Sequence, residues 1–287
     1  MFNKRHIVRT IAATVSILAL SFTAACGSGQ STASNSTDSD DITQQTYKPG
    51  KLTIATGQPA YEPWVMNDKP ESGEGYEAAV AYAVADKLGF KKSDVVWTRT
   101  AFDTAIAPGA KDWDFNIQQF GITDERKKAV DFSSSYYNDS QSVVVKKDSK
   151  FANATRVSDL KDATVGVMVG TLAYDYAKAN IKDDIQTFND DAALAQALDA
   201  GQIDVLVTST VECVYMVQSE QVKDSKVLGR LPDSEDKSGM GIVLPKDSKL
   251  TAAVTKAVDD LNADGTIKKL QDKWLAEYTT DLTELKK

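Results

Sequence analysis

From residue 51 onward, short apolar runs alternate with segments whose apolar residues recur at helical spacing. The expected strands are 51–56, 95–97, 113–117, 142–146, 164–169, 203–207 and 241–244, and the expected helices are 75–88, 102–106, 124–130, a helix from Thr171, 192–200, 250–261 and 266–277. Strands that alternate with helices in this way predict α/β sheets. Because the cycle restarts after residue 157, we expect two α/β lobes.

The N-terminal segment has the layout of an export signal. Lys4, Arg5 and Arg9 precede an apolar run at 11–22, which is shorter than the roughly 20 residues of a membrane-spanning helix. The run ends in Thr-Ala-Ala-Cys26, which resembles the lipobox of bacterial lipoproteins, although Thr stands where that motif usually has Leu. We therefore expect a signal peptide at 1–25 and a lipid on Cys26. The alternative is an ordinary signal in which this Cys is incidental.

The residues after Cys26 are mostly Ser, Thr, Gly and Asp, with little to bury. Such a sequence cannot offset its ordering entropy, so 26–48 is expected to be a flexible tether between a membrane and a globular body.

Composition excludes several classes of function. The formal charge of −8 becomes more negative once the basic leader is removed, which disfavours nucleic acid as a partner. The only histidine, His6, leaves with the leader, so the mature chain has none for a metal site, a catalytic triad or a base at neutral pH. Cys213 is then the only cysteine in the body and is expected to be a small buried hydrophobe.

Arg126 is the best candidate for gripping an anion. Thr123 is a plausible N-cap for the expected helix at 124–130, and a cation in the first turn of a helix is electrostatically disfavoured. An anion held by Arg126 and by free backbone N–H groups would remove that conflict. The alternative is a surface ion pair of Arg126 with Glu125 or Asp131.

A second anion candidate is the passage from a strand through Gly170 into a helix at Thr171, although it lacks the lysine of a phosphate-binding loop. Tyr61, Trp64 and Phe102 follow expected strands, at the sheet edge where α/β proteins bind ligands. These aromatic side chains could instead belong to the core.

Six segments of the body together resemble a known family. In chain order they are GYEAAVAYAVADKLGF, GITDERKKAVDFSSSYY, DLKDATVGVMVGT, ALDAGQIDVLV, GIVLPKDS and LNADGTIKKLQDKWL. They are similar to the bacterial extracellular solute-binding proteins of family 3, the amino-acid-binding components of ABC importers, over residues 51–278. The resemblance implies a type II periplasmic-binding-protein fold that acts as a monomer without a cofactor or metal.

In that fold, residues 49–140 with 241–287 would form one lobe and residues 141–240 the other. Two crossing segments, near 140–143 and 238–241, would let the lobes close over a small ligand.

The resemblance also implies roles for individual residues. Arg126 would grip the ligand α-carboxylate, helped by the backbone at Gln119 and Gly121 and by Thr171 from the other lobe. Tyr61 and Phe102 would sandwich the ligand side chain, and Trp64 could extend that wall.

Ser209 departs from the family pattern, because an Asp that pairs with the ligand ammonium is usual at its position. Either another acid takes the role, with Glu62 and Glu212 as candidates, or the ligand is not a simple α-amino acid. Glu212 has an alternative interpretation, because Ser209 and Glu212 have the spacing of a capping box.

The sequence therefore predicts a lipid-anchored protein on the extracytoplasmic face of the cell membrane that captures an amino acid or related small carboxylate for an ABC permease. A surface ligand sensor on the same scaffold is an alternative. A dehydratase-like enzyme is less favoured, since the mature chain would have no histidine and shows no evident carboxylate pair.

Overall fold

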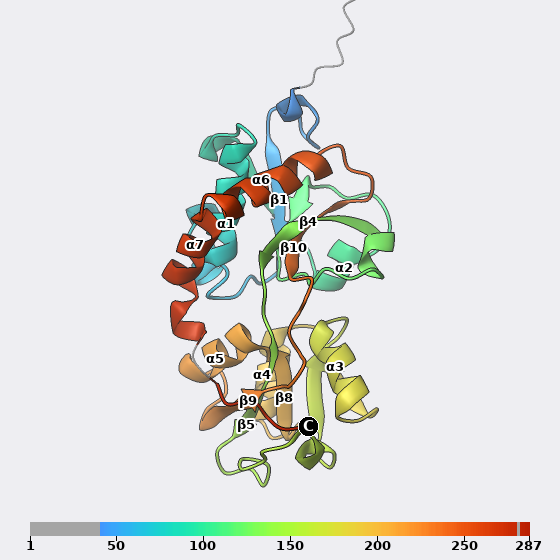
Figure 1. Cartoon of the computed structure of the whole chain (residues 1–287), viewed down its shortest axis with the longest axis vertical. Coiled ribbons are helices and arrows are strands. Elements are labelled where there is room, and N and C mark those ends of the chain that lie inside the picture. Colours follow the sequence, from blue (N-terminus) through green and yellow to red (C-terminus); the bar gives the residue numbers. More distant parts are fainter. Residues whose placement is uncertain (1–40, 280–281) are drawn as a thin grey trace, which may run out of the picture. The chain divides into compact units, whose positions relative to one another are not determined.

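The computed structural model describes residues 41–279 and 282–287, which contain two five-stranded mixed sheets with helices packed against them (Figure 1). The first sheet has the order β2-β1-β3-β10-β4. Its strands are β1 Leu52–Thr56, β2 Val95–Arg99, β3 Phe115–Asn116, β4 Val130–Tyr137 and β10 Met240–Pro245. Strand β1 runs parallel to β2 and β3, and β10 is antiparallel to β3 and β4.

The helices of the first sheet are α1 Tyr76–Lys87, α2 Phe102–Ile106, α6 Thr251–Ala263 and α7 Thr266–Trp274. Leu52 and Ile54 of β1 are fully buried and share one core with Val80 and Val84 of α1 and Val258 of α6. That spacing, two residues apart in a strand and four apart in a helix, puts each set on one face, so the pattern that predicted these elements also builds the core.

The second sheet has the order β7-β6-β8-β5-β9. Its elements are β5 Gln141–Lys146, β6 Val165–Met168, α3 Leu172–Asn180, β7 Ile185–Phe188, α4 Asp191–Asp199, β8 Val205–Ser209, α5 Thr210–Gln218 and β9 Ser225–Arg230. Successive residues of β5 face opposite sides: Val143 and Val145 pack in one cluster and Val144 in another. The second cluster contains Cys213, fully buried, as expected for a small hydrophobe.

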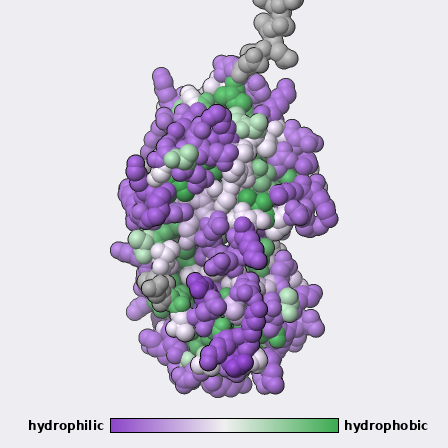
Figure 2. All heavy atoms as spheres, viewed as in Figure 1, coloured by the Kyte–Doolittle hydropathy of each residue, from purple (hydrophilic) through white to green (hydrophobic). Residues whose placement is uncertain are grey.

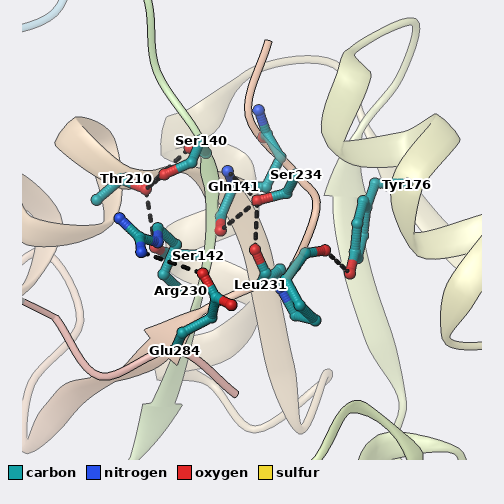
Figure 3. A network of polar contacts seen from close by, with 10 residues as sticks. Ser140, Gln141, Ser142, Tyr176, Thr210, Arg230, Leu231, Ser234 and Glu284 are labelled. Carbon is teal, nitrogen blue, oxygen red and sulfur yellow. Dashed lines mark hydrogen bonds and ion pairs between the residues drawn. The ribbon is translucent and has the colours of Figure 1, made fainter. Parts of the chain in front are cut away.

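Two segments cross between the sheets, 138–140 after β4 and 231–239 after β9 (Figure 1). They are hydrogen-bonded to each other, since the Leu231 N–H donates to the Gln141 carbonyl at 2.8 Å and the Asp236 N–H donates to the Asp139 carbonyl at 2.9 Å. Ser234 adds a side-chain link to Gln141 (Figure 3). Both crossings lie beside the positions where a hinge was expected.

The expected tether is wrong for its last eight residues. Ile42–Gln44 form a 3-10 turn, and Ile42 packs against the core of the first sheet. The Asp114 carboxylate accepts hydrogen bonds from the backbone N–H groups of Tyr47 and Thr53, so it fastens this segment to β1. A polar sequence is ordered here because a buried acid far along the chain supplies the partners that the segment lacks.

Two other expectations are corrected. The helix expected at 124–130 is a single 3-10 turn, Arg126–Lys128, because Val130 already pairs with Pro245 at the start of β4. The last residues, 282–287, were expected with the first lobe but lie on the second sheet, where the C-terminus is marked in Figure 1. Arg230 of β9 forms an ion pair with Glu284 at 3.1 Å (Figure 3), and Leu285 is buried in the core of that sheet.

The expected signal peptide and Cys26 lie outside the described residues. None of the helices in the described part of the chain is long and apolar enough to span a membrane. On the face shown in Figure 2, hydrophilic residues cover most of the surface, and hydrophobic ones appear only in small separate areas.

Candidate ligand-binding site

A cavity of about 240 Å³ is lined by residues from both sheets and from both crossing segments. Eight of the nine predicted site residues line it: Tyr61, Trp64, Phe102, Gln119, Gly121, Arg126, Thr171 and Ser209. Most of them come from loops that follow strands, because the ends of β1, β2, β3, β6 and β8 face this space.

Arg126 reaches across the cavity. Its guanidinium donates to the Gly121 carbonyl at 2.7 Å and to the Gly170 carbonyl, which belongs to the other sheet, at 2.8 Å. The alternative of a surface ion pair is wrong, because Glu125 pairs with Lys128 and Asp131 pairs with Lys246. Burial lowers the pKa of Arg126, an effect that the nearby carboxylates of Asp175 and Asp236 oppose.

An aromatic stack supports the guanidinium. The guanidinium carbon lies 5.5 Å from the centroid of the Phe102 ring, which in turn stacks on Phe120 at 4.5 Å. A flat cation on an aromatic face is held in plane while its N–H groups stay available at the edges. Phe102 therefore orients Arg126 as well as lining the cavity.

Thr171 is the N-cap of α3. Its hydroxyl accepts from the Tyr174 N–H at 3.2 Å and donates to the Met168 carbonyl at 2.8 Å. Leu172 and Ala173 of the first turn also line the cavity, so the positive end of this helix faces the same space as Arg126. The two anion candidates found in the sequence thus lie at one cavity.

Tyr61 and Trp64 line another part of the cavity. The Tyr61 hydroxyl accepts from the Ala192 N–H in the first turn of α4 at 3.3 Å, so this loop of the first sheet contacts the second. Trp64 is almost fully buried against Tyr76 and Tyr137. Trp64 is thus both a core residue and a cavity wall.

Gln119 has a left-handed backbone with φ of 52°, which is uncommon for a residue with a side chain. Glu77, in the first turn of α1, holds it there: the carboxylate accepts from the Gln119 N–H at 2.7 Å and from the Gln119 side-chain amide. The Gln119 N–H is thus occupied by Glu77, and a contact of the Gln119 backbone with a ligand stays a prediction. A Cβ at Gly121 would lie 2.5 Å from the end of the Leu172 side chain in α3, so a larger residue here would force Leu172 to shift.

Acidic side chains gather at the N-termini of α4 and α5. Asp139 accepts from the N–H groups of Ser140 and Val211 and from the Ser209 hydroxyl, so it caps α5 from the crossing segment. Burial nevertheless raises the pKa of Asp139 to about 6. Burial and the charge of Asp190 raise the pKa of Asp191, the first residue of α4, to about 6 as well.

Glu212 is the most buried of these acids, with 4 % of its surface exposed. Burial, the charge of Asp191 and the charge of Asp139 raise its pKa well above the ordinary value, while a hydrogen bond from the Trp64 indole opposes them. Ser209 caps α5 by accepting from the Glu212 N–H at 3.3 Å. Glu212 Oε1 has no hydrogen-bond partner among the described residues, so that side chain is free to face the cavity it lines.

Glu62 is the one predicted site residue that the cavity excludes. Its carboxylate accepts from the Asn67 N–H at 2.9 Å and supports the loop in which it lies. Sequence reasoning missed Asp139 and Asp191. Asp191 is an acid at a helix start, which could have marked it, whereas Asp139 lies between two strands and meets the start of α5 only in the folded structure.

The comparisons with known proteins agree with this geometry. The family model of bacterial extracellular solute-binding proteins, family 3, matches residues 52–277. The chain belongs to this family. It is therefore a solute-binding protein, as the sequence predicts, and the cavity between the two sheets is where a solute-binding protein of two lobes would hold its solute.

The L-cystine-binding protein TcyJ of Escherichia coli is 29 % identical, over 77 % of this chain and 81 % of that protein. The structure of an ancestral arginine-binding protein bound to arginine is 31 % identical with a TM-score of 0.67, and it covers 78 % of this chain and 98 % of that one. The ancestral amino acid-binding protein AncCDT-1, a precursor of cyclohexadienyl dehydratase, is 30 % identical with a TM-score of 0.65, over 79 % and 96 %. The predicted family and fold are confirmed.

Proposed function

We propose that this protein is the extracytoplasmic substrate-binding component of an ABC importer and that it captures an amino acid between its two lobes. The observation that carries the proposal is that Arg126 and the N-terminus of α3 line the same cavity as the buried acid Glu212, whose Oε1 has no hydrogen-bond partner among the described residues. A zwitterion needs one anion site and one cation site at short range, and the cavity offers both.

The α-carboxylate binds Arg126, which can turn from its two carbonyl partners to a bidentate contact with the ligand, and the first turn of α3 adds backbone N–H groups. The α-ammonium binds the acids at the opposite helix ends, Asp191 and Glu212. Glu212 would thus supply the carboxylate that Ser209 lacks, and Glu62 would have no part in binding.

Isothermal titration of ligand-stripped protein with a panel of amino acids tests this proposal. We expect micromolar or tighter binding to at least one member, and a loss of about 100-fold or more in Arg126→Ala, because hydrogen bonds to charged groups contribute about 1.5–3 kcal/mol each. Arg126→Lys keeps the charge but not the fork and should recover only part of the loss. Unchanged affinity in Arg126→Ala would refute the carboxylate site.

We also propose that Cys26 is lipidated and anchors the protein to the outer face of the cell membrane beside its permease. The lipobox-like Thr-Ala-Ala-Cys sequence supports this placement. Metabolic labelling with an alkyne fatty acid should mark the wild type and not Cys26→Ser. Equal labelling of both would contradict the anchor, and release of Cys26→Ser into the medium or periplasm would support it.

No catalysis is part of the proposal. The bound amino acid should be recovered unchanged after prolonged incubation, as measured by mass spectrometry. Because AncCDT-1 is named as a precursor of a dehydratase, loss of water from any bound ligand would be the informative contrary result.

A further inference from the structure

The cavity is strongly asymmetric in charge. Arg126 is the only lysine or arginine among the residues that line it, whereas five acids do so: Asp139, Asp190, Asp191, Glu212 and Asp236. A ligand with one positive and one negative charge would leave this imbalance unchanged. The question is which of the acids still lack a partner.

Three of the five acids have partners in the protein itself. Asp139 caps α5, and Asp190 caps α4 by accepting from the Ala193 N–H at 2.8 Å. Asp236 accepts from two backbone N–H groups through Oδ1, and although its Oδ2 has no hydrogen-bond partner among the described residues, the nearby charge of Arg126 compensates it.

Asp191 and Glu212 are not satisfied. The contact of Asp191 with the Thr208 hydroxyl is long, at 3.5 Å, and Glu212 Oε1 has no partner among the described residues. Neither acid forms an ion pair with a lysine or arginine in the described part of the chain. Burial and the charge of Asp190 raise the pKa of Asp191, and burial and the charges of Asp191 and Asp139 raise the pKa of Glu212, as expected for acids with no cation beside them.

We propose that the ligand is an amino acid with a basic side chain, so that its α-ammonium and its side-chain cation occupy Asp191 and Glu212 together while Arg126 takes the α-carboxylate. This inference rests on the proposed function and names the ligand class of the same site. The cation is organic, because no three His, Cys, Asp or Glu residues in the described ranges are grouped to hold a metal ion.

The same charges disfavour the other ligand classes. A diacid brings a second anion that has no cationic partner among the lining residues, and a disulfide-linked amino acid brings a second carboxylate with the same lack, although it also brings a second ammonium. An amino acid with a neutral side chain leaves one buried acid unpaired, and the site must then keep that acid protonated or leave its charge uncompensated.

The test compares arginine with citrulline, which has nearly the same shape but a neutral end. Isothermal titration of ligand-stripped protein at pH 7.5 should show that arginine or lysine binds roughly 10- to 100-fold more tightly than citrulline, norleucine or cystine. Tighter binding of citrulline or cystine would overturn this inference and leave the proposed function intact. Failure of every amino acid to bind would overturn both.

Two glutamate variants test whether Glu212 causes the preference for a basic side chain. Glu212→Gln should reduce the ratio of arginine to citrulline affinity by about tenfold, because it removes a charge and not the shape of the site. Glu62→Gln is the matched control, since Glu62 lies outside the cavity, and it should leave that ratio unchanged. If Glu212→Gln lowers both affinities equally, Glu212 contacts only the α-ammonium that both ligands carry, and its assignment to the side-chain cation fails.

Acid pH should erase the preference for a basic side chain. The groups that face Asp191 and Glu212 are acids or neutral: Asp139, Asp190, Tyr61, Thr208 and Trp64. The cation must therefore displace protons, and the ratio of arginine to citrulline affinity should fall as pH drops from 7.5 to 5. A ratio that is constant over this range would contradict the assignment.

Discussion

Glu77 should make the folded protein less stable as pH rises. Its side chain is fully buried in α1, and it accepts hydrogen bonds from the Tyr136 hydroxyl and from the backbone N–H of Gln119. Burial is the main cause that raises the pKa of Glu77 from 4.5 to about 7, and the hydrogen bonds oppose that shift only in part. The native state therefore keeps a proton that the unfolded chain has already lost.

The sign and size of this change in the free energy of unfolding follow from proton linkage. Between pH 4.5 and 7 the native state binds one more proton than the unfolded state, so the free energy of unfolding falls by about 1.4 kcal/mol for each pH unit. The contribution is absent below pH 4.5 and complete above pH 7. Over the full window it amounts to about 3 kcal/mol, with no discount for solvent because the carboxyl is buried.

The Glu77→Gln variant isolates this contribution. A glutamine oxygen can still accept from Tyr136 and Gln119, so the packing is kept while the titration is removed. Urea unfolding of wild type and variant at pH 5 and pH 8 should show the variant gaining about 2 to 3 kcal/mol relative to wild type between the two conditions. Glu74→Gln changes an exposed glutamate and should show no such gain. If Glu77→Gln behaves like Glu74→Gln, the burial argument is wrong.

Three further predictions concern the packing of Gly121 against Leu172, the reactivity of the Cys213 thiol, and the position of the acid in the first turn of α5. Gly121→Ala should weaken ligand binding by about tenfold, as measured by titration calorimetry, because its Cβ would overlap Leu172 of the other sheet, and adding Leu172→Ala should recover part of the loss. Cys213 should not react with a water-soluble thiol reagent until the protein is unfolded in urea, since burial raises its pKa and excludes the reagent. Adding Ser209→Asp to Glu212→Gln should restore part of the binding, because Asp is a good N-cap and returns an acid to the first turn of α5.

The sequence predicts the structural features that depend on neighbouring residues. Strand and helix periodicity depends on neighbouring residues, so seven of the ten strands in the described residues could be predicted, whereas β4, β7 and β9 were missed. Arg126 was identified as a ligand-binding candidate because it conflicts with its own short segment, and it does line the cavity. The expected helix around it was wrong because pairing of Val130 with a distant strand overrode the local preference.

What could not be predicted depends on partners far apart in the chain. The segment around Tyr47 looks like a tether until Asp114 is placed beside it, and Glu77 looks like a surface residue until Tyr136 and Gln119 close over it. The sequence favoured Glu62 over Glu212, because Glu212 also fits a capping box. In the structure Glu212, in the first turn of α5, lines the cavity and Glu62 does not.

Ser209 stands where the family usually has an Asp, and Glu212 in the same turn would supply the carboxylate instead. A site can in this way keep its charge while the residue at one position changes. The N-cap and the third residue of a helix lie on the same turn, and the longer glutamate side chain can span part of the distance between them. Ser209 caps α5, and in the proposed site Glu212 would carry the carboxylate, so two residues would share the tasks that an N-cap aspartate could perform alone. The neutral residue at 209 is therefore no argument against an amino-acid ligand.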